Sequence, residues 1–415
     1  MVKEFFERLS CSLQLWCIEN QNKFFHGIIT TPLLGTLYYA DFVAYSMDPK
    51  KFLLHRREIM GNADNFASLG RIILGDHALV SESIMAPQNR PPYLGRVELV
   101  PEKVADDFLL FLSDADVDGE GKKHKAIHDY FWEVVVPDAE KRVAADPDAF
   151  ATYVAALSDG KETPSEDVQQ KMVVKYIFHS LSGSVPEDDM VDCIQQLFFT
   201  GGSSMYHIGA IKLPFLLRGL LWKGSGKRRE LIKKAVDFIL ASPSMEKFEP
   251  VVGIEKDDFG ELMLAILGIA GCLGTEGLVS NILDKIPADY KLKDINDKRE
   301  VMMTVLEAAR IKAPVNTVNF RLAEESKTIK IHFGKEFTMR KGTLCGASIG
   351  LASHDPIVFE NPEKFDPQRD NLMKAILNFN HVGFSPTGSG TRQCPGRNLA
   401  VKFCSDLLIA LQQNK

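Results

Sequence analysis

The alternation of apolar and polar positions along the chain predicts a mostly helical protein. From about residue 100 onward, apolar residues recur at the spacing of amphipathic helices. The stretches assigned to helices in this way are 102–113, 123–145, 187–198, 228–241, 258–283, 297–312 and 395–413. Strand-like runs are confined to residues 25–60 and 314–348, the latter including 328–333 and 343–347. The pattern therefore predicts the α+β class, mostly α with a minor β part.

Nothing in the sequence divides the chain. A proline-rich meander follows the second strand region, from His354 to Pro367, but there is no long linker, repeat or low-complexity tract. We therefore expect one large domain over residues 1–415.

The helix expected at 297–312 carries the strongest pattern. Asp297 and Glu300 fit a capping box at its start. Its apolar stripe has helical spacing and consists of Met302, Val305, Leu306 and Ala309. Glu307 and Arg310 lie off that stripe and are three residues apart, so their side chains can meet. On this helix alone, a weak exposed ion pair is the default expectation.

Composition and charge narrow the class of protein. The 415 residues are 45% hydrophobic and 25% charged, with a net charge of −6 and no long basic run, which argues against a nucleic-acid partner. Charged residues interrupt Met1–Asn20, and the longest apolar run, Leu262–Leu273, is shorter than a membrane span. We expect a cytoplasmic or organelle-stroma protein without a signal peptide or transmembrane anchor, and peripheral membrane contact stays open.

The seven cysteines are scattered, and no CxxC pair occurs among them. A structural zinc site and a disulfide framework are therefore poorly supported. Cys394 is set apart by its surroundings, because it lies just before the last expected helix in a glycine-rich segment containing Gly388, Gly390 and Gly396. Glycines allow backbone amides to approach a sulfur closely, and a helix start favours the thiolate, which is the form that ligates metals. The alternative, without a function for the sulfur, is a glycine-rich turn around a buried cysteine.

The pattern GxGxRxCxGRxLA around Cys394 closely resembles the haem-ligand loop of the cytochrome P450 superfamily. The resemblance implies a haem b cofactor with Cys394 as the axial iron ligand and Arg392 meeting a haem propionate. Glu307 and Arg310 look like the ExxR motif of that family, and Arg369 stands where the meander arginine completes the triad that holds the haem-binding core. The strong resemblance covers residues 258–412.

A weaker resemblance covers residues 100–135. His124 and His128 follow Asp118-Gly119 and stand where the family has aromatic and arginine residues that contact a propionate. A solvated helix face is an equally good interpretation of these two histidines.

The long apolar helix departs from the monooxygenase pattern. Ala270 and Gly271 match a small-residue pair, but the positions of the acid and the threonine that deliver protons to iron-bound dioxygen are Leu273 and Gly274. Neither leucine nor glycine has a side chain that can donate or accept a proton. Thr275 and Glu276 come one residue later, which turns them by ~100° around the helix. Only a local bulge in the helix would return Thr275 and Glu276 to the helix face on which the acid and the threonine normally lie.

The stretch from Pro314 to Arg321 resembles the fatty acid hydroperoxide branch of the family, which includes allene oxide synthases, hydroperoxide lyases and epoxyalcohol synthases. Such enzymes cleave the O–O bond of their own substrate and need neither dioxygen nor a reductase. The match is incomplete, because this chain has no insertion before the cysteine and no asparagine at Ala270. Asn316 and Asn319 could supply polar groups near the iron, or be ordinary turn and strand residues.

Three functions follow from these features. The leading one is a haem-thiolate enzyme that rearranges, dehydrates or cleaves a hydrophobic lipid hydroperoxide. The second is a monooxygenase or peroxide-using hydroxylase that relays protons through Thr275 and Glu276 and, as a monooxygenase, needs a redox partner. The third is a non-catalytic haem-binding protein. The sequence stops at Lys415 after the last helix, so the β-rich C-terminal tail of the family is expected to be absent.

Overall fold

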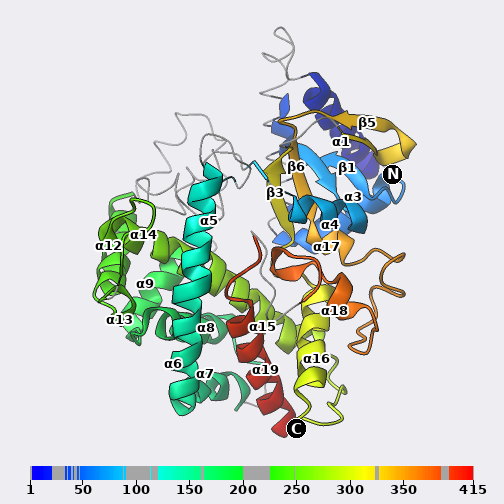
Figure 1. Ribbon diagram of the computed structural model, residues 1–415. Coiled ribbons are helices and arrows are strands. Elements are labelled where there is room, and N and C mark those ends of the chain that lie inside the picture. The colour runs from blue at the N-terminus through cyan, green and yellow to red at the C-terminus, as the bar shows by residue number, and fades with distance from the viewer. Residues whose placement is uncertain are drawn as a thin grey trace.

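The computed structural model describes residues 2–20, 33–34, 36–38, 41, 44–45, 47–86, 88–89, 113, 120–159, 163–199, 225–246, 248–322, 327–384 and 392–414. Helices form most of the described chain, and a small sheet lies at one end (Figure 1). This confirms the expected mostly α, α+β class. Most of the helix expected at 102–113 falls outside the described residues.

One long helix crosses the middle of the protein. It consists of α14 (Lys256–Ala265), a π-helical segment η5 (Ile266–Leu273) and α15 (Gly274–Lys285). Its length and apolar composition would allow a membrane span, but 61% of its most apolar stretch is buried. Burial of this kind is typical of a central core helix.

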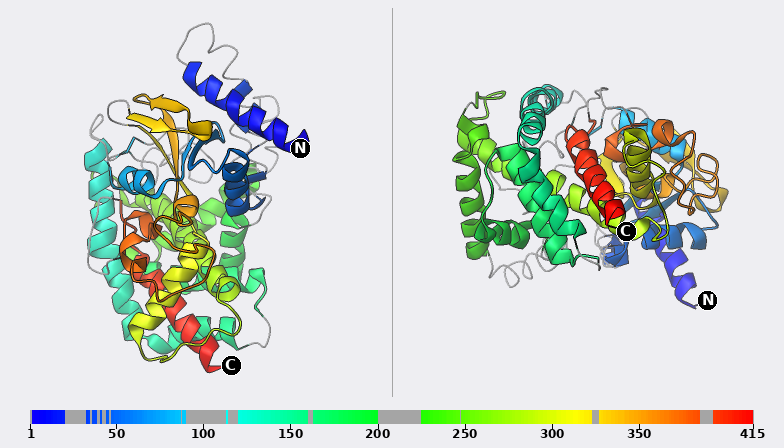
Figure 2. Two further views of the ribbon diagram at one scale, coloured as in Figure 1. Left: turned by 90° about the vertical axis from the view of Figure 1, so that its right-hand side faces the viewer. Right: turned by 90° about the horizontal axis from the view of Figure 1, so that it is seen from below.

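Three further helices surround α15. They are α8 (Glu166–Ser182), α16 (Lys298–Ile311) and α19 (Arg397–Gln413), and all three pack against it. The view from below in Figure 2 shows α19 between α16 on one side and α7 (Pro147–Ser158) on the other. The largest hydrophobic cluster of the described residues joins these helices to α9 (Asp188–Phe198), α12 (Ser225–Leu240) and α13 (Pro243–Glu246).

A second long helix runs along one side of the molecule. The range 123–145 becomes α5 (Glu120–Tyr130), a π-helical turn η3 (Phe131–Val135) and α6 (Val136–Ala145). Pro137 has no N–H to donate to the carbonyl of Glu133, so an ordinary α-helical ladder is interrupted here. The π turn lies directly before that position.

The main sheet has the strand order β1-β2-β6-β3. Its strands are β1 (Asn65–Ser68), β2 (Arg71–Leu74), β6 (Leu344–Ser348) and β3 (Thr317–Arg321). β2 and β6 are parallel, with Ile72 opposite Cys345, and the other two pairings are antiparallel. A separate hairpin consists of β4 (Lys327–Lys330) and β5 (Glu336–Met339). The strands expected at 328–333 and 343–347 are confirmed, although the first ends early in a 3-10 turn at His332–Gly334.

The expectation of strands between residues 25 and 60 is wrong where the structure describes that range. Pro49–Ile59 form the helix α3, because the Asp48 carboxylate accepts the Lys51 amide at 3.0 Å and Pro49 suits a first helical turn. The strands come later, in β1 and β2. Leu69 and Gly70 join them with φ values of 54° and 66°, which suits a tight hairpin turn.

The remaining helices are short or lie at the edge of the core. They are α1 (Val2–Asn20), α4 (His77–Met85), α17 (Ile349–Ala352) and α18 (Leu372–Ala375). The range 297–312 is confirmed as α16, and Asp297 caps it. The reciprocal half of the capping box is wrong, because the Glu300 carboxylate accepts the amides of Lys293 and Asp294 from the preceding loop instead.

Candidate functional site

Cys394 lies between a 3-10 turn, η7 (Asn378–Asn380), and the start of α19. Its amide donates to the carbonyl of Phe379 at 2.9 Å. The φ values of Phe379 and Asn380 are 66° and 55°, a left-handed conformation that is unusual for a phenylalanine and better tolerated by an asparagine. Such strain persists only when the surroundings hold it, and it is often found at functional sites. Gly388 and Gly390 lie outside the described residues.

The electrostatics of Cys394 differ from the expectation. Burial raises the pKa of its thiol, while the Gly396 amide and the Arg397 charge lower it to a smaller extent. The helix begins only at Arg397, with Gly396 as its N-cap, so the helix start does not outweigh desolvation. The protein alone therefore does not favour the thiolate. A metal cation bound to the sulfur would, because coordination deprotonates a thiol.

Three aromatic side chains of α5 and η3 form a ladder next to this loop. The rings of His124 and His128 stack at 5.9 Å, and those of His128 and Trp132 at 5.8 Å. The Nε2–H of His128 donates to the carbonyl of Gln393 at 3.0 Å. Both histidines are buried, so their interpretation as a solvated helix face is wrong. Their contact with a propionate stays a prediction.

Arg397 continues the ladder from the other side. Its guanidinium carbon lies 4.5 Å from the centre of the Trp132 ring, and its Nη1 approaches the carbonyl of Cys394 at 3.5 Å. The residue is only 1% exposed. Sequence reasoning missed both Trp132 and Arg397. Trp132 could have been found from its position four residues after His128, which places both on one helix face.

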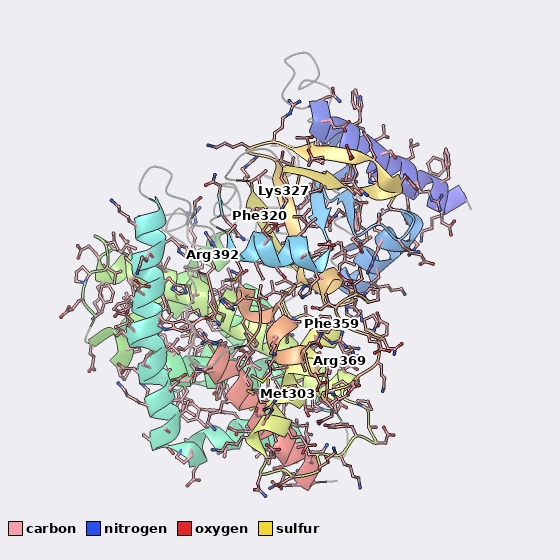
Figure 3. All side chains as sticks on the ribbon, turned by 45° about the vertical axis from the view of Figure 1, so that its right-hand side comes forward. Met303, Phe320, Lys327, Phe359, Arg369 and Arg392 are labelled. Atoms are coloured by element: carbon pink, nitrogen blue, oxygen red, sulfur yellow. The ribbon has the colours of Figure 1, made fainter. Side chains whose placement is uncertain are left out.

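Glu307, Arg310 and Arg369 meet in the structure. Arg310 forms two hydrogen bonds to the Glu307 carboxylate, at 2.7 and 2.8 Å, and Arg369 Nε adds a third at 3.1 Å. The side chains of Glu307 and Arg310 are fully buried, so the expectation of an exposed pair for this helix alone is wrong. In Figure 3, Arg369 lies near Phe359, and Arg392 lies apart from both.

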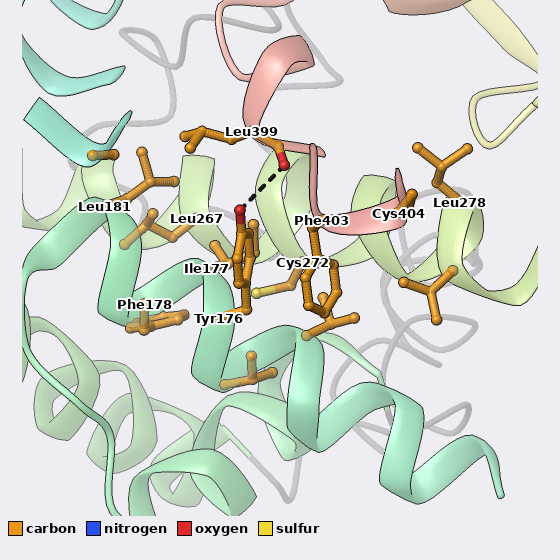
Figure 4. Close-up of a cluster of buried hydrophobic side chains, with 14 of the residues drawn as sticks. Tyr176, Ile177, Phe178, Leu181, Leu267, Cys272, Leu278, Leu399, Phe403 and Cys404 are labelled. Atoms are coloured by element: carbon orange, nitrogen blue, oxygen red, sulfur yellow. Dashed lines mark hydrogen bonds between the residues drawn. The ribbon is translucent and has the colours of Figure 1, made fainter. Parts of the chain in front are cut away.

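One face of the central helix is closed by packing. Cys272, Leu267 and Leu278 point towards α8 and α19, where the rings of Tyr176 and Phe403 stack at 4.1 Å (Figure 4). An added Cβ at Gly268 would lie 2.3 Å from the Phe198 ring, so this position has no room for a side chain.

The opposite face is open. Ala270 is exposed although the helix crosses the core, Leu273 is half-buried, and an added Cβ at Gly274 would meet nothing within 4 Å. Gly271 has no such space beside it, because an added Cβ at this position would lie 2.8 Å from the Ile177 side chain. Space therefore borders the helix at Ala270, Leu273 and Gly274, and these residues offer it no polar side chain.

Thr275 and Glu276 do not lie on the open face. The π-helical segment directly before them is a bulge of the kind that could have brought them back. Thr275 is nevertheless only 3% exposed and lies within the core. Burial raises the pKa of Glu276, the charge of Glu166 raises it further, and the charge of Lys312 lowers it.

Asn316 and Asn319 are held by local hydrogen bonds. The side-chain amide of Asn316 donates to the carbonyl of Ala313 at 3.1 Å, and the backbone carbonyl of Asn316 accepts the Gly350 amide at 3.2 Å. The Asn319 side chain accepts a hydrogen bond from Arg71 within the sheet part. The structure thus places Asn316 in the loop before β3 and Asn319 within β3, and a role of either side chain near the iron stays a prediction.

Haem fits this arrangement. No group of three metal-ligating side chains occurs in the part of the chain that the structure describes, so a single sulfur would need a macrocycle to supply most of the remaining ligands. Ala270 and Gly274 leave room on one side of the core, and an added Cβ at Gly396 also meets nothing within 4 Å. The buried His124 and His128 and the half-buried Cys394 are the side chains that would hold the group.

The comparisons with known sequences point to one family. Residues 281–411 match the family model "Cytochrome P450". Ent-cassadiene hydroxylase of Oryza sativa subsp. japonica is 31% identical over 108 residues, which cover 26% of this chain and 20% of that enzyme. Divinyl ether synthase CYP74M1 of Selaginella moellendorffii is 29% identical over 128 residues, 28% of this chain and 26% of that enzyme. These matches span only about a fifth and a quarter of the two enzymes.

Longer matches come from a second synthase and from solved structures. Divinyl ether synthase CYP74M3 of Selaginella moellendorffii is 21% identical over 349 residues, 71% of this chain and 70% of that enzyme. The structure of retinoic acid-bound cyanobacterial CYP120A1 aligns with a TM-score of 0.61 and 15% identity, covering 87% of this chain and 86% of the other. CYP109B1 from Bacillus subtilis aligns with a TM-score of 0.57 and 15% identity, covering 83% and 86%. At this identity the structural likeness concerns the fold.

Proposed function

Because this chain belongs to the cytochrome P450 superfamily, with haem as its cofactor, we propose that it is a lipid hydroperoxide-metabolising enzyme in which the Cys394 sulfur would bind the haem iron. The bound haem supplies an iron centre that can cleave a peroxide O–O bond. The reaction would rearrange, dehydrate or cleave the substrate without dioxygen or a reductase.

The observation that carries this proposal is the chemistry of the open helix face. Ala270, Leu273 and Gly274 border the space next to the helix, and none of them can donate or accept a proton. Activation of dioxygen consumes protons, whereas a hydroperoxide enters with its O–O bond already formed and reduced to the peroxide level. An apolar face is thus sufficient for hydroperoxide chemistry and poorly suited to a proton relay.

The same face would protect a reactive substrate. Ala270 and Leu273 offer the substrate an apolar surface, which binds the hydrocarbon chain of a lipid and keeps water away from a carbon radical. Two of the relatives, at 29% and 21% identity, are divinyl ether synthases, and this supports the assignment to the hydroperoxide-metabolising branch.

Other residues would hold the cofactor. We assign contacts with the propionates to Arg392, His124 and His128, because these side chains are buried around the cysteine loop. Glu307, Arg310 and Arg369 would not touch the haem; their hydrogen bonds fix α16 to the loop at 360–369 and so maintain the shape of the core.

The test mixes the purified ferric protein with a polyunsaturated fatty acid hydroperoxide in the absence of reductant. We expect rapid loss of the conjugated-diene absorbance and a product identified by mass spectrometry as a rearranged, dehydrated or cleaved oxylipin. Cys394→Ala is the matched control and should lose this activity. Product formation that requires NADPH and a reductase would contradict the proposal.

A second candidate is a monooxygenase, which the hydroxylase from rice favours. It would need Thr275 and Glu276 to move onto the open face. Dependence of turnover on a reductase and on Glu276 would identify it. Haem binding without either activity would identify the third candidate, a non-catalytic haem protein.

A further inference from the structure

We propose that Trp132 and Arg397 form a positioning pair for the sulfur ligand, and that the buried charge of Arg397 raises the reduction potential of the iron. The proposal rests on the ligation of haem by Cys394. It concerns the side of the cysteine loop that faces α5 and η3.

Side-chain donors face three consecutive backbone carbonyls of the loop. Asn380 Nδ2 donates to the carbonyl of Arg392 at 3.0 Å, and His128 Nε2 donates to that of Gln393 at 3.0 Å. Arg397 Nη1 approaches the carbonyl of Cys394 at 3.5 Å. The backbone that carries the sulfur is thus bound from three different elements, which restricts the direction in which the Cβ–Sγ bond points.

Trp132 links two of these three donors. Its ring stacks at 16° on His128 and also lies beneath the Arg397 guanidinium, 4.5 Å from the guanidinium carbon. A guanidinium placed over an indole is attracted by the negative face of the ring, and the attraction strengthens when water is excluded. Trp132 therefore fixes the position of Arg397.

The π-helical turn explains why the ladder is aligned. Residues four apart on an α-helix are turned by ~40° relative to each other, because a turn contains 3.6 residues. The turn at Phe131–Val135 is wider, and it begins directly before Trp132. The widened turn allows the ring of Trp132 to stay under Arg397 while it still stacks on His128.

The Arg397 charge has an electronic consequence. The residue is 1% exposed, and guanidinium stays protonated at neutral pH, so a fixed positive charge lies beside the ligand loop with little screening by water. A positive charge stabilises the form of the iron that carries one more electron. Removal of the Arg397 charge should therefore lower the reduction potential of the iron, so that more of the protein is in the ferric form at a given applied potential.

The experiment is a spectroelectrochemical titration of the haem-loaded protein and of four variants, Arg397→Gln, Arg397→Lys, Trp132→Phe and Trp132→Leu. For Arg397→Gln we expect the ferrous-to-ferric ratio at a fixed applied potential to fall about tenfold, which is ~59 mV for a one-electron couple. Arg397→Lys retains the charge and should stay within about twofold of the wild type. If Arg397 had only a structural role, the reduction potentials of Arg397→Gln and Arg397→Lys would not differ according to the charge of the side chain.

The Trp132 variants test positioning separately. The ferrous carbon monoxide complex of Trp132→Leu should lose its thiolate-type Soret band about fivefold faster than that of the wild type, whereas Trp132→Phe retains a ring face and should lie between them. A Trp132→Leu complex as durable as the wild type would overturn the positioning role. Equal potentials in Arg397→Gln and the wild type would overturn the electronic role.

Failure of the underlying ligation has a different signature. A wild-type protein that binds haem without a thiolate-type carbon monoxide spectrum would refute Cys394 as the ligand before any variant is considered. If Arg397→Gln does not retain haem, the decisive comparison is between Arg397→Lys and Trp132→Leu. The proposal requires the first to keep the wild-type potential and the second to lose the thiolate band faster, and it is overturned if either does not.

Discussion

Arg369 donates its Nε–H to Glu307 at 3.1 Å, across 62 residues of the chain. The same Glu307 oxygen accepts the amide of Asp366 at 2.9 Å, and Arg369 also binds the carbonyls of Glu360, Asn361 and Lys364. One buried carboxylate therefore connects α16 to an irregular loop that has little regular secondary structure of its own. The core around the cofactor depends on this connection.

Substitution Glu307→Gln should destabilise the protein strongly. It leaves the fully buried Arg310 without a counter-charge, and breaking a buried ion pair in this way typically costs about 3–5 kcal/mol. We expect a large drop in the free energy of unfolding, measured by urea denaturation, together with loss of bound haem. The control is Lys141→Ala, which removes an exposed pair with Asp138 and should change stability by less than about 1 kcal/mol.

Gly274 and Gly268 should respond in opposite ways to larger side chains. Gly274→Leu adds atoms where an added Cβ meets nothing within 4 Å, so the haem-free protein should unfold at the same temperature or a higher one. The added side chain should fill the cofactor or substrate space and lower the haem content or the hydroperoxide turnover at least about tenfold.

Gly268→Ala is the matched variant on the closed face. Its Cβ would lie 2.3 Å from the Phe198 ring, and such overpacking typically costs about 1–3 kcal/mol. We expect a lower unfolding temperature by circular dichroism. Similar behaviour of the two variants would refute the assignment of an open and a closed face.

The sequence was informative where local pattern and motif agree. The Asp297 cap, the apolar stripe of α16 and the triad partners Glu307 and Arg310 are close in the chain, so short-range reasoning could place them. The sequence alone did not indicate that this helix is buried on all sides. Burial of that kind is decided by α15, α19 and the loop at 360–369, which come from distant parts of the chain.

Reasoning from position in the helix failed for other residues. A proton relay through Thr275 requires a bulge before this residue, and the structure contains a π-helical segment there, but Thr275 is still buried. The rotation of a helix about its axis is set by its neighbours. The missed residues Trp132 and Arg397 belong together only in three dimensions, since 265 residues separate their neighbours His128 and Gln393 in the chain.

Glu276→Gln distinguishes the two enzyme classes and also tests the surroundings of Glu276. Burial raises the pKa of this carboxyl, so the stability that its protonated form provides is present at low pH and is lost as pH rises through the folded pKa. The variant should be more stable than the wild type at pH 7, and the difference should shrink towards pH 4. Hydroperoxide turnover should stay within about twofold of the wild type, and a large loss would favour the relay.

Asn380→Ala should weaken the cysteine loop while leaving the fold intact. The Asn380 side chain donates to the carbonyl of Arg392, and its backbone is in a left-handed conformation with a φ of 55°, which alanine tolerates less well than asparagine. We expect faster transfer of haem to an apo-haem acceptor protein. Asn380→Gly keeps the backbone conformation accessible and removes only the hydrogen bond, so it should lie between Asn380→Ala and the wild type. A transfer rate for Asn380→Gly above that of Asn380→Ala would contradict the contribution of backbone strain.

His332 should contribute to acid destabilisation far from the cofactor. Burial, with a smaller effect of Lys335, lowers the pKa of this histidine to about 4, from an ordinary value of 6.5. Between pH 6.5 and 4 the unfolded chain therefore binds more protons than the folded one, and the free energy of unfolding falls as the pH is lowered. One pKa unit corresponds to about 1.4 kcal/mol, so we expect a loss of about 2 kcal/mol from this residue after allowing for solvent screening. His332→Gln should remove that part of the pH dependence in urea titrations, whereas Phe333→Ala, which changes the exposed neighbour without a titratable group, should retain it. Equal acid slopes in His332→Gln and the wild type would show that His332 is not kept neutral by its burial.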